Sequence, residues 1–324
     1  MTSTKIAPAS PTLRDWLILA FLGLIWGASF LGVEMALIGF GPVSIAAGRV
    51  AIAAIILLFI AIFYGDGLPT FDNPTNRRIW LHCFIMGLFT NALPFSLLSW
   101  GQQIVTSSFA GICMAVVPLF VLPLAHYMVP GERMSLAKGI GFLFGFGGVV
   151  MLVGGDHLGK AFATTGTDST LMMTAQFSCV IASCCYAIGS INTRLCPPVS
   201  TLSYSATGLM LGSFMLLPTA LYFEGIPALP AQSALAGILF LAIFPTAVAT
   251  LLLTVLINRA GPTFLALVNY QVPIWAVLIG TLVLSEALPG HFLSALAIIL
   301  AGLAISQFYD RWRTKIAGKS HRLL

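Results

Sequence analysis

Long apolar stretches follow one another along this chain and restrict the folds that it can adopt. A helix needs about 20 predominantly apolar residues to cross the hydrocarbon core of a bilayer. Ten stretches of roughly that length occur, at residues 16–37, 43–64, 79–100, 109–129, 136–154, 171–191, 202–223, 235–257, 264–284 and 291–308. Strands of a membrane barrel would be about ten residues long and would alternate in polarity. The sequence therefore predicts an all-α integral membrane protein with ten transmembrane helices.

Composition indicates that lipid surrounds most of the protein. Hydrophobic residues make up 58% of the 324 residues and charged residues only 8%, whereas an ordinary soluble domain carries about 25% charged residues. The first apolar stretch is longer than the core of a signal peptide, which has about 7–15 residues, and Glu34 follows where a cleavage region would lie. We therefore expect the first helix to be retained.

The positive charges indicate the orientation of the chain. When the joints are assigned alternately to the two sides from a cytoplasmic N-terminus, the outside receives only Lys160, and Arg49 lies inside a span. All other lysines and arginines fall on the inside, as the positive-inside rule requires. Splitting or merging one span would scatter these charges, so their distribution supports the helix count. We expect a multi-pass protein of the inner (plasma) membrane of a bacterium-like cell, with both termini cytoplasmic.

The second half of the chain repeats the first weakly. Four pairs of residues match: Phe109 with Phe264, Val117 with Val272, Pro118 with Pro273 and, with one residue skipped, Glu132 with Glu286. Each half holds five predicted helices, an odd number, so the two repeats must be inverted relative to each other (5+5). Inverted repeats place a binding site near the midplane and support alternating access.

The repeat suggests a simple division of the chain. We expect a cytoplasmic N-terminal tail at residues 1–15, a first five-helix repeat at 16–156, an external linker at 157–170, a second five-helix repeat at 171–308 and a basic cytoplasmic tail at 309–324. No segment is large enough for a separate soluble domain.

Short motifs in both halves resemble a known family. They are Trp26-Gly-Ala-Ser-Phe30, Pro42…Arg49, Ser107…Pro118…Gly131-Glu132-Arg133, Gly261-Pro262…Pro273 and Ser285-Glu286. The pattern resembles the EamA branch of the drug/metabolite transporter (DMT) superfamily over nearly the whole chain. The resemblance implies two five-helix repeats around a central cavity and transport of metabolites, often export of amino acids or related compounds. The second half departs from the pattern, because its span 202–223 has no arginine matching Arg49.

Arg49 lies well inside a predicted span. At about 1.5 Å per residue it is about 10 Å below Pro42, and charge within a membrane is costly and usually partnered. Glu34 lies about one turn inside the outer end of the preceding span, so the two side chains could meet. Two interpretations stay open. The residues form a fixed ion pair that locks two helices, or Arg49 receives an anionic group such as a substrate carboxylate.

Polar and aromatic side chains gather around Pro273 in the ninth span: Asn269, Tyr270, Gln271 and Trp275. The matching stretch of the fourth span is apolar. Proline lacks an N–H and frees a carbonyl about one turn earlier, here that of Asn269, which requires a polar partner or a cavity. We therefore predict that this group faces the substrate.

Residues of other spans extend the predicted binding surface. We expect Asn91 in the third span, Trp26 and Ser29 in the first and Tyr186 in the sixth to form its polar and aromatic walls. We expect four prolines to break helices: Pro94, Pro118, Pro245 and Pro273. For each polar residue the alternative is an interhelical hydrogen bond, which also joins membrane helices.

The expected partners are a small-molecule metabolite and the lipid bilayer. We expect no nucleic acid, no cofactor and no metal, since the six cysteines lack the spacing of metal ligands. We expect a monomer, with a homodimer as the alternative. The small residues that favour packing within one protomer are Gly141, Gly145 and Gly148 in one span and Ser294, Ala297 and Ala301 in another.

Four functional classes can be weighed. We expect a secondary transporter, an exporter or exchanger of small organic metabolites that works by alternating access. An enzyme of the membrane would need clustered catalytic groups, and a channel would need rings of charge or a repeated filter; the sequence shows neither. A membrane-embedded enzyme or a non-transporting sensor or assembly protein remains the alternative.

Overall fold

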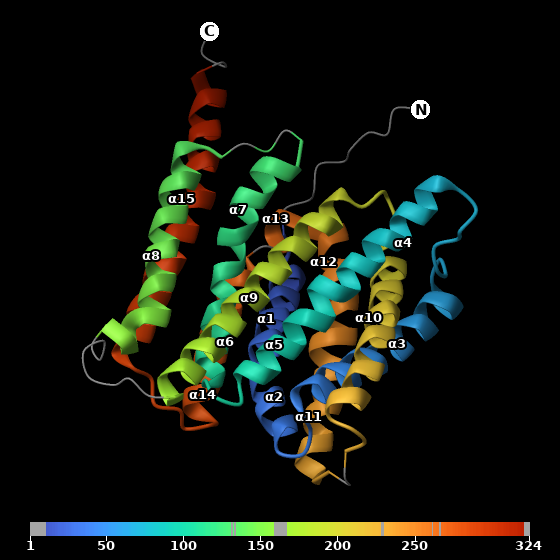
Figure 1. Ribbon diagram of the computed structural model, residues 1–324. Helices are drawn as coiled ribbons and strands as arrows, with labels where there is room; N and C mark the ends of the chain where they lie inside the picture. The colour runs from blue at the N-terminus through green and yellow to red at the C-terminus, as the bar shows by residue number, and fades with distance from the viewer. Residues whose placement is uncertain are drawn as a thin grey trace.

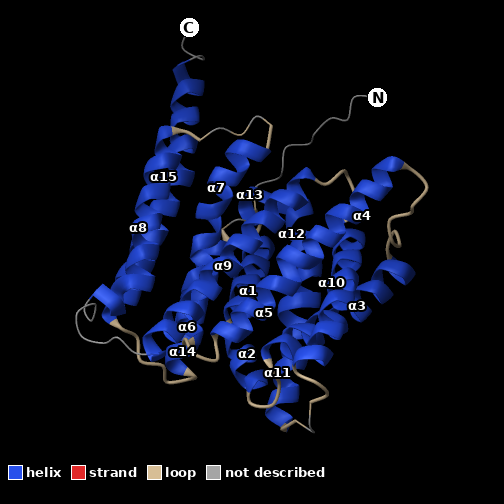
Figure 2. Cartoon of the chain, in the orientation of Figure 1, coloured by secondary structure: helices blue, strands red, loops and turns tan. Residues whose placement is uncertain are grey.

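The computed structural model describes residues 11–130, 132, 134–158, 167–227, 230–260, 262–265 and 267–320. All regular elements within these residues are helices, joined by short loops (Figure 2). The all-α prediction is therefore confirmed for this part of the chain. Some predicted features lie outside it: Gly131, Arg133, Lys160, Gly261, residues 1–10 and 321–324 of the tails, and residues 159–166 of the linker.

The first half contains α1 (Leu13–Gly27), α2 (Ser29–Leu37), α3 (Pro42–Tyr64), α4 (Pro74–Met86), η1 (Gly87–Ala92), α5 (Leu93–Gly101), α6 (Ser107–Cys113), η2 (Met114–Val116), α7 (Val117–Met128) and α8 (Leu136–Leu158). The second half contains α9 (Thr167–Leu195), α10 (Thr201–Phe223), α11 (Gln232–Ala242), η3 (Ile243–Val248), α12 (Ala249–Ala260), α13 (Pro262–Leu265), α14 (Val268–Leu282) and α15 (Gly290–Ser320).

Local sequence explains where several helices begin. α3 and α4 begin at Pro42 and Pro74, and proline suits the first helical position because an N–H there would have no partner within the helix. Asn73 also caps α4 by accepting a hydrogen bond from a backbone N–H of its first turn at 2.8 Å. The helix thus begins before the predicted residue 79. The prediction from apolar stretches began too late because the first turn is polar and carries Arg77.

Eight helical spans are long and apolar enough to cross a membrane: Leu13–Leu37, Pro42–Tyr64, Pro74–Gly101, Ser107–Met128, Leu136–Gly154, Thr170–Leu195, Thr201–Phe223 and Gln232–Ile257. Two shorter apolar helices follow, Val268–Leu282 and Gly290–Ser306. A turn at Leu267 separates α14 from α13 and shortens the ninth predicted span. The protein is therefore a multi-pass membrane protein, and the count of ten crossings stays a prediction.

The helices alternate in direction between two ends of the bundle (Figure 1). α1, α4, α8 and α10 begin at one end, where α15 also ends, and α3, α6, α9 and α11 begin at the other. We call the first end the basic end and the other the opposite end. The starts of α4 and α8 and the ends of α9 and α12 give the basic end its charges: Arg77, Arg78, Lys138, Arg194 and Arg259. α1 and α9, which begin the two halves, run in opposite directions.

Helices of the two halves pack against each other. α1 packs on α14, α2 on α11, α3 on α10 and α5 on α9, so most pairs join one half to the other. The largest cluster of buried apolar side chains includes Leu22 of α1, Phe109 of α6 and Leu256 of α12. The hydrophobic core of the bundle is therefore the boundary between its halves.

α8 and α15 form a pair at one side of the bundle (Figure 1). Gly141 is buried against the backbone of Gly302, and a Cβ at either glycine would clash with the facing helix. The predicted glycine face of α8 therefore packs within the protomer. The predicted matching stripe of α15 is wrong, because Ala297 and Ala301 are exposed. The helix is rotated so that Gly302 takes the contact, which the two alanines cannot reach.

Candidate functional site

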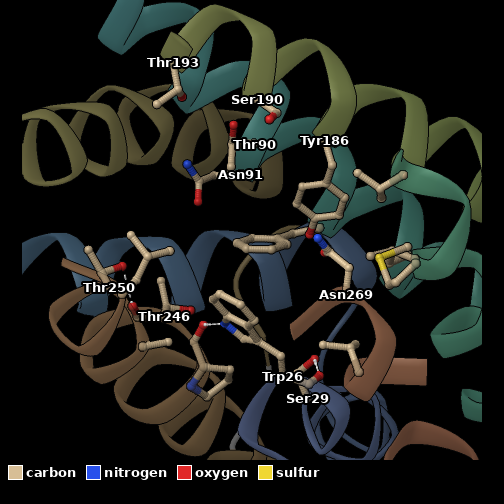
Figure 3. A pocket seen from close by; sticks show the side chains of 18 of the residues that line it. Trp26, Ser29, Thr90, Asn91, Tyr186, Ser190, Thr193, Thr246, Thr250 and Asn269 are labelled. Atoms are coloured by element: carbon tan, nitrogen blue, oxygen red, sulfur yellow. Dashed lines mark hydrogen bonds between the residues drawn. The ribbon is translucent and has the colours of Figure 1, made fainter. Parts of the chain in front are cut away.

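A cavity of about 850 Å³ lies inside the bundle. Its walls come from both halves of the chain. The first half contributes α1 to α5 with η1, η2, α7 and α8, and the second half contributes α9, α10, η3, α12, α14 and α15. Figure 3 shows polar side chains on facing walls, with Thr90, Asn91 and Ser190 across from Thr246 and Thr250. Its volume is within the range of about 300–1,000 Å³ that small-molecule sites occupy.

Five of the predicted binding residues lie on the cavity wall: Trp26, Ser29, Asn91, Tyr186 and Asn269. Trp26 donates its indole N–H to the carbonyl oxygen of Pro245 at 3.0 Å, which fixes the ring across the boundary between the halves. The structure therefore brings together residues from α1, α2, η1, α9 and α14 on the wall of one cavity.

Three other predicted residues are not among the described lining residues: Tyr270, Gln271 and Trp275. Gln271 packs against Gly23 of α1, and Trp275 packs against Gly27 one turn along. An α-helix turns by about 100° per residue, so Asn269 and Gln271 cannot share one face. For Gln271 and Trp275 the structure favours the packing interpretation over the cavity interpretation.

Arg49 also lies on the cavity wall and is 7% exposed. Its Nε donates a hydrogen bond to Oγ1 of Thr246 at 2.8 Å, and its guanidinium carbon lies 3.7 Å from the centre of the Phe95 ring. The ion pair with Glu34, one of the two interpretations left open by the sequence, is absent from the structure, where both residues are described. Glu34 instead accepts a hydrogen bond from Nε2 of Gln102 at 3.2 Å.

The two charges face different spaces, which explains why they do not pair. Glu34 lines a second, smaller pocket near the opposite end, with Gln102 and Glu286. Arg49 lies deeper, where α3 packs beside η3. A short connection between two helices therefore did not bring their charged side chains together, because the two side chains leave their helices at different depths and directions.

Two π-helical segments border the cavity at equivalent places in the two halves. η1 precedes Pro94 and holds Thr90 and Asn91, while η3 contains Pro245 and Thr246. π-helical turns occur frequently at functional sites because they change which side chains face inward. Thr246, which sequence reasoning missed, follows a helix-breaking proline directly, and that position was an available signal.

The other two predicted helix breaks differ from each other. Pro118 follows the 3₁₀ segment η2 and occupies the first turn of α7. Pro273 lies inside the regular helix α14, whose break comes earlier, at Leu267. Both halves thus depart from α-helical geometry near the cavity. The position of a proline alone does not predict where each departure occurs.

Gln102 separates the central cavity from the smaller pocket of about 310 Å³ at the opposite end. It is the one residue that lines both among those described. Its side chain is 4% exposed, and its Nε2 also donates to the carbonyl oxygen of Phe30 at 3.0 Å. This hydrogen bond joins α5 to α2 and closes the cavity towards the opposite end.

Two glutamates strengthen the closure by capping helices of the other half. Glu286 accepts hydrogen bonds from the backbone N–H of Ser107 at 2.8 Å and of Ser108 at 3.0 Å, and from the Ser108 hydroxyl. The first N–H groups of a helix have no partner within it and favour a negative charge. Ser285, directly before Glu286, has φ +54°, a left-handed conformation that aims the carboxylate at α6.

Glu224 makes the same kind of contact at the start of α3. Its two carboxylate oxygens accept from the backbone N–H of Val43 at 2.9 Å and of Ser44 at 2.8 Å. Glu224 follows α10, so this cap again connects the second half to the first. Two helix N-termini at the opposite end are thus held across the boundary by carboxylates.

The basic end is built differently. Lys138, Thr193 and Ser306, which lie towards this end, line the central cavity. Glu132 forms an ion pair with Arg194 at 2.6 Å and lies 3.8 Å from Nζ of Lys138, and its side chain stays 30% exposed. The cavity therefore extends towards the basic end, whereas at the opposite end Gln102 and its hydrogen bonds lie between it and the smaller pocket.

Within the described ranges, no group of three histidine, cysteine, aspartate or glutamate side chains could hold a metal ion. The cysteines there are unpaired thiols, most of them buried. What the arrangement offers is a polar and aromatic cavity with one buried cation.

Comparison with known proteins places these features in a family. The chain matches the EamA-like transporter family twice, over residues 14–154 and 173–308. It is 25% identical over 286 residues to the uncharacterized inner membrane transporter YedA of Escherichia coli, covering 88% of this chain and 86% of that protein. An uncharacterized transporter of Archaeoglobus fulgidus is 23% identical, over 90% of this chain and 98% of that one.

Two further matches cover most of this chain. A WAT1-related chloroplastic protein of Arabidopsis thaliana is 22% identical, covering 92% of this chain and 70% of that protein. A solved crystal structure superposes with a TM-score of 0.63 at 20% identity, covering 92% of this chain and 98% of the other, which is a likeness of fold. The two family matches together span most of the chain, so this protein belongs to the EamA-like transporter family.

Proposed function

We propose that this chain is a secondary transporter that moves small organic metabolites across the inner membrane by alternating access, as an exporter or exchanger. The observation that carries the proposal is the asymmetric cavity at the boundary between the halves. It extends towards the basic end and is closed by Gln102 and Glu286 at the other. A site that reaches one side only is what one state of an alternating-access cycle requires.

The proposal includes the topology. In it, α13 with α14 forms the ninth crossing and α15 the tenth, giving two inverted five-helix repeats with both termini cytoplasmic. The basic end is then the cytoplasmic end, because positively charged residues stay inside. The conformation is the inward-open state, and the opposite end is its closed external gate.

The two gates use equivalent glutamates in this proposal. Repeat alignment pairs Glu132 with Glu286, and the α6 start with the α13 start. In the outward-open state Glu132 leaves Arg194 and caps the first turn of α13, while Glu286 releases α6. Closure of one gate thus uses the same chemistry as closure of the other, as inverted repeats allow.

The binding surface in this proposal consists of the predicted residues that line the cavity: Trp26, Ser29, Asn91, Tyr186 and Asn269. A test uses the purified full chain in proteoliposomes, with counterflow measured for amino acids, carboxylic acids, amines, nucleosides and sugars. We expect saturable flux of one class above that of protein-free liposomes. Asn269→Ala should lower this flux with protein abundance unchanged.

A matched control keeps the test specific. Ser294→Ala removes a polar side chain of α15 whose hydroxyl bonds only within its own helix and which is not among the described lining residues. It should leave the flux unchanged. Absence of flux for every class would overturn the transport proposal, and equal effects of both alanine variants would move the binding surface elsewhere.

A further inference from the structure

The environment of Arg49 points to the charge of the solute. Its guanidinium is buried, yet among the described residues its one hydrogen bond is from Nε to the neutral Thr246 hydroxyl. A guanidinium has five N–H donors in a planar fork. No carboxylate of the described residues lies within ion-pair distance of it. Most of its hydrogen-bonding capacity is therefore left to whatever enters the cavity.

Arg49 is held in a defined position. Oγ1 of Thr246 donates to the carbonyl oxygen of Leu241 at 2.8 Å, so its lone pairs remain for the Nε–H of Arg49. On its flat face the guanidinium stacks over Phe95, a contact that favours a cation. Such a fork is prepared for two parallel hydrogen bonds to a carboxylate, with little loss of side-chain freedom on binding.

The charges around the cavity are one-sided. Its charged lining residues are Arg49 and Lys138, and the described lining contains no aspartate or glutamate. Lys138 lies towards the basic end and has Glu132 beside it, whereas Arg49 lies deeper with no such partner. A buried charge without a counter-charge is unfavourable, so an entering anion would be stabilised. An entering ammonium would meet no carboxylate.

The rest of the wall would receive an apolar body. Trp26, Phe30, Phe95 and Tyr186 contribute aromatic rings to the same cavity, and the Phe95 and Tyr186 rings pack edge to face at 6.4 Å. Aromatic rings bury large apolar area and accept flat or branched hydrocarbon groups. The described wall thus combines one deep cation with apolar surface.

Resting on the proposed transport function, we infer that the solute is a small organic monoanion, a carboxylate on an apolar body without a free amine, whose carboxylate binds Arg49. Keto acids, aryl acids and N-acylated amino acids have this chemistry. Zwitterionic amino acids and amines do not, because their ammonium group would be desolvated without a counter-charge.

Four matched probes test this inference on the purified full chain: 3-phenylpropionate, its amide 3-phenylpropanamide, phenylalanine and 2-phenylethylamine. Binding is measured by calorimetry and by the shift in melting temperature, since a ligand of the folded state raises it. We expect 3-phenylpropionate to bind at least about tenfold more tightly than each of the other three, as the loss of a charged hydrogen-bond pair implies.

Variants locate the preference. Arg49→Gln should weaken binding of the carboxylate by about tenfold to hundredfold while leaving the weak binding of the amide unchanged. Arg49→Lys keeps the charge but not the fork, so its affinity should be intermediate; it also serves if the Gln variant does not fold. Arg78→Gln, the same change at an exposed position outside the cavity, should have no effect.

The outcomes separate this inference from the transport proposal. Equal binding of the carboxylate and its amide, no response to any probe, or an unchanged anion preference in Arg49→Gln would each overturn the inference. Flux of neutral or cationic solutes in proteoliposomes would also overturn it but would leave the transport proposal standing. Absence of flux for every solute would overturn the transport proposal itself.

Discussion

The two ends of the bundle differ in the contacts that their glutamates make, although the repeat alignment pairs Glu286 with Glu132. At the opposite end Glu286 is bound to the start of α6, and Glu224 to the start of α3. At the basic end Glu132 pairs with side chains of Arg194 and Lys138 instead. The start of α10 there is capped locally, by Ser200 accepting from the N–H of Ser203 at 3.1 Å. Caps that cross the boundary therefore occur where the cavity is closed.

The sequence contains a reason for this difference. The alignment that pairs Phe109 with Phe264 also pairs Ser107 with Pro262. Ser107 donates its backbone N–H to Glu286, but proline has no N–H to donate. A cap by Glu132 at the basic end would have one hydrogen bond fewer than the cap by Glu286. Closure of the basic end is therefore expected to be weaker, which agrees with the conformation observed.

The largest effect is expected from Glu286→Gln, which makes the closed end resemble the open one. Hydrogen bonds to a charged group contribute about 1.5–3 kcal/mol, so their loss should favour opening of the proposed external gate. Ser99 is 2% exposed and lines the central cavity, so Ser99→Cys reports that opening. We expect labelling by a membrane-impermeant thiol reagent from outside to rise about tenfold and transport to fall.

The parent protein without the reporter cysteine corrects for labelling of the native thiols. Unchanged labelling together with unchanged transport would show that the Glu286 cap is a feature of packing and no gate.

A second variant should strengthen closure of the basic end. Pro262→Ser restores the missing N–H at the start of α13, so Glu132 gains the donor that Glu286 already has. A hydrogen bond to a charged group contributes about 1.5–3 kcal/mol, so at the low end of that range the equilibrium should shift towards the outward-open state by about tenfold. The same Ser99→Cys reporter should label faster from outside. The shift should vanish in the background of Glu132→Gln, and its persistence there would refute the reciprocal cap.

Glu224→Gln should have a smaller effect on the gate. Glu224 caps α3 but does not line the pocket beside Gln102, so its loss weakens the helix start and leaves the passage itself intact. A lost N-terminal cap costs about 1 kcal/mol. We expect a lower melting temperature with little change in Ser99→Cys labelling. Labelling as fast as in Glu286→Gln would make the two caps equivalent gates.

The smallest effect on the resting conformation is expected at the open end. Arg194 is 55% exposed and Glu132 30% exposed, and exposed ion pairs contribute about 0.2–1 kcal/mol. Arg194→Gln should therefore barely change the melting temperature and should not lower transport, since it releases Glu132. Glu132→Gln should also preserve stability but lower transport. Equal transport in both variants would contradict a role for Glu132 in closing the gate.

Parts of the site were predictable because they depend on local chemistry. A lone arginine among apolar residues marks Arg49, and a proline within one helical turn of a polar residue marks Asn91 and, in retrospect, Thr246. The group around Pro273 was only partly predictable. Asn269 lies on the cavity wall, while Gln271 and Trp275 pack on glycines of α1. Which face of a helix turns inward depends on its neighbours, and apolar residues all round a membrane helix carry little signal of that rotation.

The sequence by itself determined the membrane environment, the helical class and the repeated proline and glutamate positions. These follow from the cost of exposing backbone or charge to lipid, which acts on each segment separately. Only the tertiary structure decided that Arg49 binds Thr246 and not Glu34, that Gln102 binds the Phe30 carbonyl and that Glu286 caps α6. Those contacts join residues far apart in the chain, and they depend on the depth and rotation at which whole helices pack.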